Sequence, residues 1–168
     1  MLFNNVRPSQ NIFYLVVLGL MVAVIGSALG FEHIGGYLPC KLCLEQRQPW
    51  YIGIPIMLFA TISVYSKWPA WFSRGLILIA GIVMFYSLYL GVHHAGVEWG
   101  WWMGPGDCGA VEGGLATTTT DFLKQLEETT PPSCDEAALR IFGLSFAGWN
   151  AIASLAGALL AIRTAFAK

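Results

Sequence analysis

The amino-acid sequence predicts an all-α integral membrane protein, a bundle of four transmembrane helices with one large external loop. Of its 168 residues, 56% are hydrophobic and only 11% are charged, and the mean hydropathy is +0.61. Soluble domains carry about 25% charged residues, so this composition argues against an ordinary soluble fold. The sequence has no evident internal repeat or second domain, and no basic run typical of nucleic-acid binding.

Four stretches without charged residues set the expected positions of the helices. They cover residues 8–31, 48–66, 75–97 and 141–162, which is 24, 19, 23 and 22 residues. About 18 to 20 helical residues cross a hydrocarbon core, and a backbone in lipid must satisfy its own hydrogen bonds. We therefore expect membrane helices over about 12–31, 48–66, 75–93 and 141–162, with an external loop over about 94–140.

The first stretch also resembles a cleaved secretory signal, because Arg7 precedes it and small residues follow at Gly26 to Gly30. A signal core is normally about 7 to 15 residues long, whereas Ile12 to Leu29 is apolar or small throughout. This length favours a helix that is retained.

Basic residues predict the orientation. With the N-terminus in the cytoplasm, Arg7, the connector Lys67–Arg74 and the tail from Arg163 hold five basic residues and no acidic one. The other four basic residues and all ten acidic residues then lie outside. Short cytoplasmic segments are enriched in Lys and Arg, which favours both termini inside.

All four cysteines fall in polar connectors on the expected outer side. Cys40 and Cys43 lie between the first two helices, and Cys108 and Cys134 lie in the large loop. Disulfides persist outside the cytoplasm, so this placement supports the orientation independently of the charges. The two pairs indicate a relay of two disulfides beside a bilayer.

Two other uses of the cysteines remain open. A structural zinc site needs about four ligands, but the 26-residue separation of Cys108 and Cys134 lacks the second close pair of common zinc motifs, so we expect no metal. Two inert structural disulfides would instead make the protein a non-catalytic membrane scaffold.

Residues near the close pair suit redox chemistry. Cys40 follows Pro39 at the mouth of the second helix, where free N–H groups favour a thiolate. Arg47 lies one turn beyond Cys43, where a guanidinium either reaches lipid headgroups or meets a polar ligand. His93 and His94 end the third helix and point to different sides, which weakens haem ligation by this pair alone.

The large loop begins with tryptophans that suit the membrane interface, Trp99, Trp101 and Trp102. Gly104 to Asp107 breaks regular structure just before Cys108. Residues 121–128 are expected to form a short amphipathic helix on the membrane surface, which Pro131 and Pro132 end before Cys134.

The order and spacing of these features resemble the disulfide bond formation protein B (DsbB) family over nearly the whole chain. The resemblance rests on Pro39–Arg47 with its two cysteines, His94 before a Trp-rich loop, Cys108, Cys134, Phe142–Ser145 and Trp149. It implies a quinone-linked thiol oxidase of the bacterial inner membrane, with its cysteines on the periplasmic side.

The resemblance also implies roles for the cysteines. The loop pair, Cys108 and Cys134, would accept electrons from a reduced thioredoxin-fold protein like DsbA, with Cys108 forming the mixed disulfide. Electrons would then reach the close pair, in which Cys43 contacts a membrane quinone, either ubiquinone or menaquinone. Arg47 and His94 would border the quinone ring, and His93 is the weaker of the two histidine candidates.

A vitamin K epoxide reductase-like protein also uses two cysteine pairs and a quinone in a helical bundle. Its loop pair precedes its close pair in the chain, whereas Cys40 and Cys43 come first here. The order favours the DsbB family.

Overall fold

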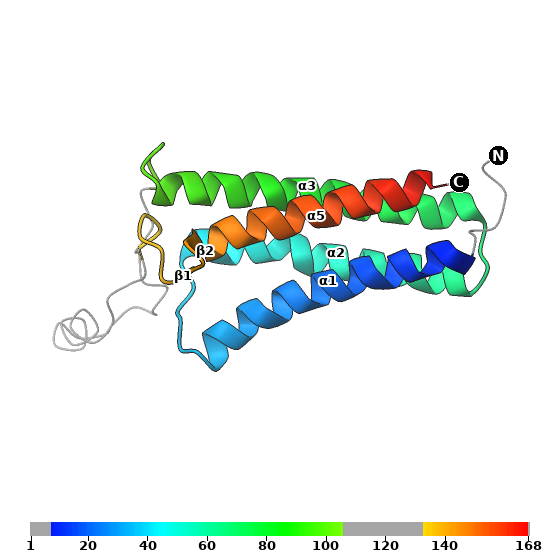
Figure 1. Cartoon of the computed structure of the whole chain (residues 1–168), viewed down its shortest axis with the longest axis horizontal. Coiled ribbons are helices and arrows are strands. Elements are labelled where there is room, and N and C mark those ends of the chain that lie inside the picture. Colours follow the sequence, from blue (N-terminus) through cyan, green and yellow to red (C-terminus); the bar gives the residue numbers. More distant parts are fainter. Residues whose placement is uncertain (1–7, 106–132, 168) are drawn as a thin grey trace, which may run out of the picture.

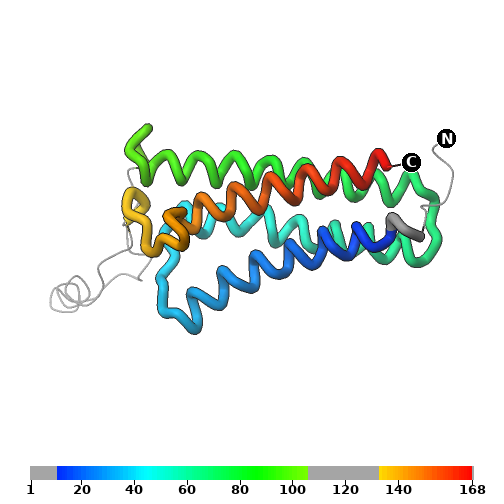
Figure 2. Tube along the Cα trace, viewed as in Figure 1, coloured from blue at the N-terminus to red at the C-terminus, as the bar shows by residue number. Residues whose placement is uncertain are grey.

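The computed structural model describes residues 8–105 and 133–167 of the chain. These residues form the helices α1 (Pro8–His33), α2 (Lys41–Tyr65), α3 (Ala70–Glu98) and α5 (Phe146–Phe166), and the short strands β1 (Arg140–Ile141) and β2 (Leu144–Ser145). The helices lie lengthwise beside one another (Figure 1). The start of α1 and the end of α5 lie at one end of the bundle, and the antiparallel β1–β2 hairpin lies at the other (Figure 2).

The helices are not packed equally closely. Helix α3 packs extensively against α5 and α2, whereas α1 makes fewer contacts and diverges from the others toward the hairpin end (Figure 1). A Cβ atom on Gly91 would come within 2.9 Å of the Ala151 nitrogen, so glycine allows α3 and α5 to approach closely. Ser154 donates a 2.8 Å hydrogen bond to Ser87 across the same interface. Small and hydroxylated residues are typical of helix contacts in membranes.

Large apolar side chains cover much of the outside of the bundle. Four of them, Ile12, Phe59, Ile82 and Leu159, are each more than half exposed. A separate apolar core is buried between the helices. Such extensive apolar exposure suits a lipid surface better than water. In the described residues, three helices are long and apolar enough to cross a membrane, namely residues 11–33, 70–98 and 146–166. These findings are consistent with the expected all-α membrane protein.

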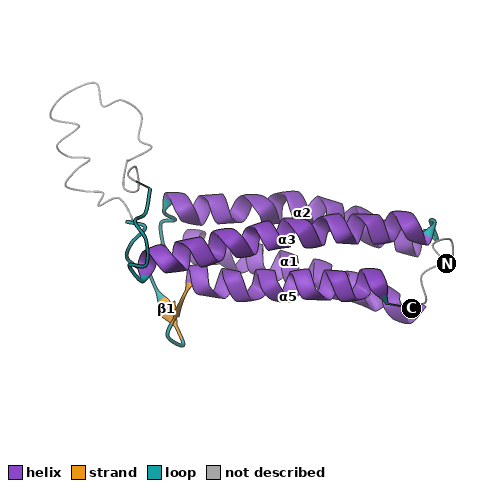
Figure 3. Ribbon diagram, turned by 90° about the horizontal axis from the view of Figure 1, so that it is seen from above, coloured by secondary structure: helices purple, strands orange, loops and turns teal. Residues whose placement is uncertain are grey.

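Helix α2 is not among the three candidate spans, because its uncharged part has a lower mean hydropathy, with Gln48, Pro49 and Pro55 among its residues. It nevertheless lies inside the same bundle as the three apolar helices, as the view from above shows (Figure 3). Its crossing of the membrane, and the orientation of the bundle, stay predictions.

The observed helices differ from the expected spans at their ends. Helix α2 begins at Lys41 and α3 continues to Glu98. Both extend beyond the uncharged stretches, because a charged residue can mark the edge of an apolar stretch without ending the helix. The expectation that a helix begins at residue 141 is wrong: the chain turns at Phe142 and Gly143, whose φ values are +52° and +83°. Helix α5 begins after Ser145, whose hydroxyl caps it by accepting from the Gly148 N–H. The expected helix over residues 121–128 lies outside the described residues.

Candidate functional site

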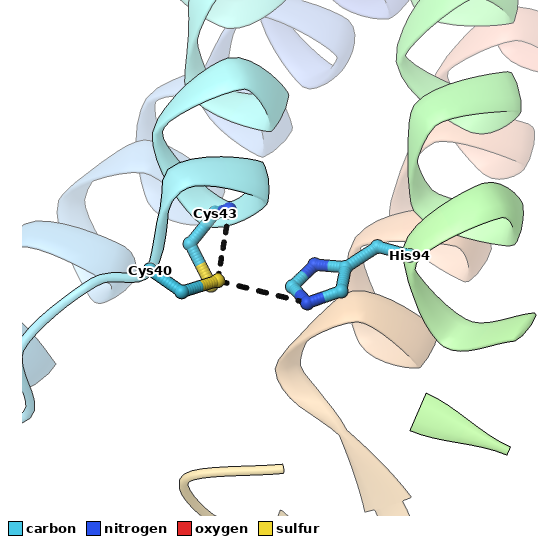
Figure 4. Close-up of side chains that lie close together, drawn as sticks. All are labelled: Cys40, Cys43 and His94. Atoms are coloured by element: carbon cyan, nitrogen blue, oxygen red, sulfur yellow. Dashed lines mark hydrogen bonds between the residues drawn. The ribbon is translucent and has the colours of Figure 1, made fainter. Parts of the chain in front are cut away.

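The close cysteine pair lies at the N-terminus of α2. Cys40 is the N-cap, and its Sγ accepts a 3.3 Å hydrogen bond from the Cys43 backbone N–H (Figure 4). The two sulfur atoms are 3.0 Å apart, and both residues are free thiols. The Pro39–Cys40 sequence therefore places the thiol at the helix terminus as predicted, and one turn of α2 brings the second thiol beside it.

The surroundings of the two thiols separate their pKa values in opposite directions. The hydrogen bond from the Cys43 thiol, followed by that from His94, lowers the pKa of Cys40 to about 4 against the opposing effect of burial. The same interaction raises the pKa of Cys43, since its thiol is the donor to Cys40, and burial raises it further. The reduced pair therefore consists of a Cys40 thiolate and a Cys43 thiol.

Of the two adjacent histidines, only His94 faces the cysteine pair. Its side chain is 3% exposed, and its Nε2 lies 3.7 Å from the Cys40 sulfur (Figure 4). His93 instead stacks on Trp102 and lies beside Tyr89, on another side of α3. The structure thus brings His94, and not His93, to the thiols.

Three further polar residues join this site that the sequence analysis did not identify. The side chains of Gln46 and Glu98 are buried near His94. Gln46 Nε2 is hydrogen-bonded to His94 Nδ1, and Glu98 Oε1 lies 3.8 Å from His94 Nε2. Asn150 of α5 donates a 2.7 Å hydrogen bond to Gln46. The four-residue spacing of His94 and Glu98 was a signal that they share a helix face. Asn150 carried no such local signal.

A cavity of about 420 Å³ has Cys43 of the close pair in its wall, and His94 does not line it. It lies among the diverging end of α1, the first turns of α2 and the start of α5, and most of its wall is apolar. The polar side chains that line it include Gln46, Arg47 and Asn150, and Cys43 lines it where Cys40 does not. Apolar pockets of this size with a few polar groups are typical sites for small organic ligands.

Arg47 lies in the wall of this cavity. Its guanidinium forms an ion pair with Glu32 near the end of α1 and a 3.5 Å hydrogen bond to the Ala28 carbonyl. Only 13% of its side chain is exposed. The guanidinium is therefore held between α1 and α2 rather than extended toward the bundle exterior.

A third cysteine lies beside the close pair. Cys134 is 1% exposed and disulfide-bonded, and it belongs to a buried cluster with Cys40, Leu42 and Val97, against which Cys43 packs. Cys108 lies outside the described residues. Residues more than 90 positions apart in the sequence thus come together, which favours thiol exchange between the loop and the close pair.

Cys40, Cys43 and His94 also bring three potential metal-ligand atoms within 4.8 Å of one another. A structural zinc site takes about four ligands. In the described part of the chain, this group has three members, and Glu98 Oε1 lies 3.8 Å from the Nε2 of one of them, His94.

Two comparisons with known proteins found matches. A model of the family described as disulfide bond formation protein DsbB matches residues 10–164. An uncharacterised protein of Rickettsia prowazekii (strain Madrid E), RP370, is 27% identical over 158 residues, which covers 92% of this chain and 88% of that protein. No solved structure matches the chain significantly.

Proposed function

The chain belongs to the disulfide bond formation protein DsbB family, and we propose that it is a thiol oxidase of the bacterial inner membrane. In this proposal it reoxidises a periplasmic thioredoxin-fold dithiol protein like DsbA and passes the electrons through two disulfides to a membrane quinone. The observation that carries the proposal is the position of the close pair. Cys40 belongs to the buried cluster that contains Cys134, whereas Cys43 lines the apolar cavity.

The residues around the cavity suit a quinone. The apolar walls would hold its ring, and the Arg47 guanidinium in the wall would supply a cation to stabilise the negative charge that reduction places on the quinone oxygens. A bound quinone supplies a two-electron acceptor. Ubiquinone and menaquinone share the carbonyl chemistry that these residues would recognise.

The loop pair begins the proposed relay. A thiolate of the reduced partner attacks the sulfur of Cys108, and Cys134 leaves as a thiolate. Cys134 then attacks Cys40, its neighbour in the buried cluster, and Cys43 leaves as a thiolate at the cavity wall. The second thiol of the partner then attacks the mixed disulfide and releases Cys108 as a thiolate. Cys108 attacks Cys134, which reforms the loop disulfide and releases Cys40, so two electrons now reside on Cys40 and Cys43.

The opposite pKa shifts of the reduced pair suit its reoxidation. The Cys40 thiolate would be the nucleophile that bonds to the Cys43 sulfur. A quinone in the cavity would accept the two electrons released, together with the Cys43 proton and one proton from solvent. The close disulfide is thereby restored. Overall, two electrons and two protons pass from the partner dithiol to the quinone.

The test uses purified full-length protein, ubiquinone-1 as a soluble quinone, and a reduced thioredoxin-fold dithiol protein. Quinone-dependent oxidation of the dithiol is expected for the natural sequence and is expected to disappear in Cys43→Ser. Met103→Leu, a substitution of an exposed apolar residue outside the cavity, serves as the control and should remain active. Oxidation that continues undiminished in Cys43→Ser would refute the relay, and its absence in the natural sequence would favour a scaffold with structural disulfides.

A further inference from the structure

A chain of hydrogen bonds links α5 and α2 to His94. The Trp50 indole N–H donates to Asn150 Oδ1 at 2.9 Å, and Asn150 Nδ2 donates to Gln46 Oε1 at 2.7 Å. The Gln46 amide nitrogen then faces His94 Nδ1. Trp50 and Gln46 are buried, so this chain lies largely inside the bundle.

The first residue of this chain fixes its direction. An indole N–H can only donate, so Asn150 must turn its oxygen to Trp50 and its nitrogen to Gln46. Gln46 must then accept through Oε1, which leaves its Nε2–H₂ group facing His94. His94 Nδ1 can accept this hydrogen bond only when it carries no hydrogen. In the neutral imidazole the hydrogen is therefore on Nε2.

The other side of the imidazole supports the same tautomer independently. Nε2 faces two groups that are acceptors when ionised, the Cys40 sulfur at 3.7 Å and Glu98 Oε1 at 3.8 Å. The Glu98 side chain is 4% exposed, and its Oε2 has no hydrogen-bond partner in the described residues. A hydrogen on Nε2 supplies a donor where two buried acceptors meet, whereas a lone pair there would supply none.

We propose that Trp50, Asn150 and Gln46 are positioning residues that hold His94 in the tautomer with hydrogen on Nε2, directed at Cys40. The proposal rests on the proposed function, because it explains how Cys40 becomes the nucleophile of the reduced pair. A neutral donor stabilises the thiolate without adding a positive charge to a buried site. The hydrogen bond from His94 is the second of the favourable interactions that lower the pKa of Cys40.

The position of the hydrogen can be measured directly. The full chain with Cys43, Cys108 and Cys134 replaced by Ser, and with His33 and His93 replaced by Gln, leaves one thiol and one histidine. Nitrogen-15 NMR of this protein at pH 8 distinguishes protonated from unprotonated ring nitrogens. We expect His94 Nδ1 to give the signal of an unprotonated nitrogen and Nε2 that of a protonated one. The reverse assignment would overturn the proposal.

Two variants of the same shape test whether the chain controls this hydrogen. In Gln46→Glu an ionised carboxylate can only accept, so Nδ1 must become protonated. Asn150→Asp changes a residue that does not contact His94 directly. Gln46 must then turn its Nε2 to the new carboxylate and its Oε1 to His94 Nδ1, so Nδ1 must again become protonated. The expected readout is a shift of the Nδ1 signal from the unprotonated to the protonated position.

The matched control is Gln48→Glu, which adds the same charge to α2 at an exposed position two residues away. It should leave the Nδ1 signal unchanged, whereas an equal shift would mean that charge alone moves the hydrogen. A residue that merely supports folding would not move the hydrogen either, so an unchanged signal in both network variants would contradict the proposal. The measurement needs neither quinone nor partner. A failed oxidation assay and a failed tautomer assignment are therefore separate outcomes.

Discussion

The two ends of the helical bundle are built from the same helices and differ in how they use space and polarity. Toward the end where α1 begins and α5 ends, Met57, Met84, Ala158 and Ala161 are fully buried in one apolar core. Toward the other end, the amide of Gln46 and the imidazole of His94 are buried between helices, and a cavity of about 420 Å³ lies beside Gln46. The first end also buries polar groups, but these include the small paired hydroxyls of Ser63 and Ser73. We call these the packed end and the polar end.

The difference shows how a small membrane bundle can hold a reactive site. At the packed end, Gly81 lets α3 approach α5 so closely that a Cβ there would lie 3.3 Å from the Ala161 Cβ. At the polar end, α1 diverges and most buried polar groups have hydrogen-bond partners in other helices. Helix α3 stays closely packed on α5 toward both ends, at Gly81 and at Gly91, and the cavity lies where α1 diverges.

The largest expected effect concerns the thiolate at the polar end. Alkylation of Cys40 by iodoacetamide, in reduced protein with Cys108 and Cys134 replaced by Ser, should have a midpoint near pH 4, because that is the pKa of Cys40 in the folded protein. Thiolate is the reactive form, so the rate should stay constant at higher pH and fall as the pH drops through about 4. Mass spectrometry after each reaction identifies the labelled cysteine.

The same protein unfolded in denaturant is the control for this profile. There the midpoint should return to about 8.5, the ordinary value for a cysteine. A midpoint near that value in the folded protein would show that the polar end does not lower the pKa of Cys40. It would contradict the inference that this end stabilises a thiolate.

Local patterns predicted much of this comparison, and contacts between helices accounted for the rest. Charge-free stretches predicted the helices, and the Pro39–Cys40 sequence predicted a thiol at a helix terminus. The choice between His93 and His94 depends on how α3 is rotated. Hydropathy leaves that rotation undetermined in a helix that is apolar on nearly all sides. Gln46 and Asn150, 104 residues apart, meet only through the packing of α2 against α5.

The same substitution at two positions of α5 would test the contrast in packing. Ala158 is fully buried at the packed end, so Ala158→Leu should destabilise the protein by about 1–3 kcal/mol through overpacking. Ala153 lines the cavity, so Ala153→Leu has space for the larger side chain. It should leave thermal unfolding nearly unchanged in detergent micelles and raise the KM for quinone. Equal destabilisation by both substitutions would show that the polar end is as closely packed as the other.

The smallest expected effect separates two roles of Arg47 at the polar end. Arg47→Ala should raise the KM for quinone roughly tenfold, because a hydrogen bond to a charged group contributes about 1.5–3 kcal/mol and this side chain is partly exposed. Thiol exchange with the partner should change little, since Arg47 lines the cavity and not the cysteine cluster. Glu32→Gln removes the charge of its partner while Arg47 remains. If Arg47 acts on the quinone, only Arg47→Ala raises the KM for quinone. If Arg47 acts only by joining α1 to α2, both variants raise this KM alike, because each weakens the ion pair between Arg47 and Glu32 in the cavity wall.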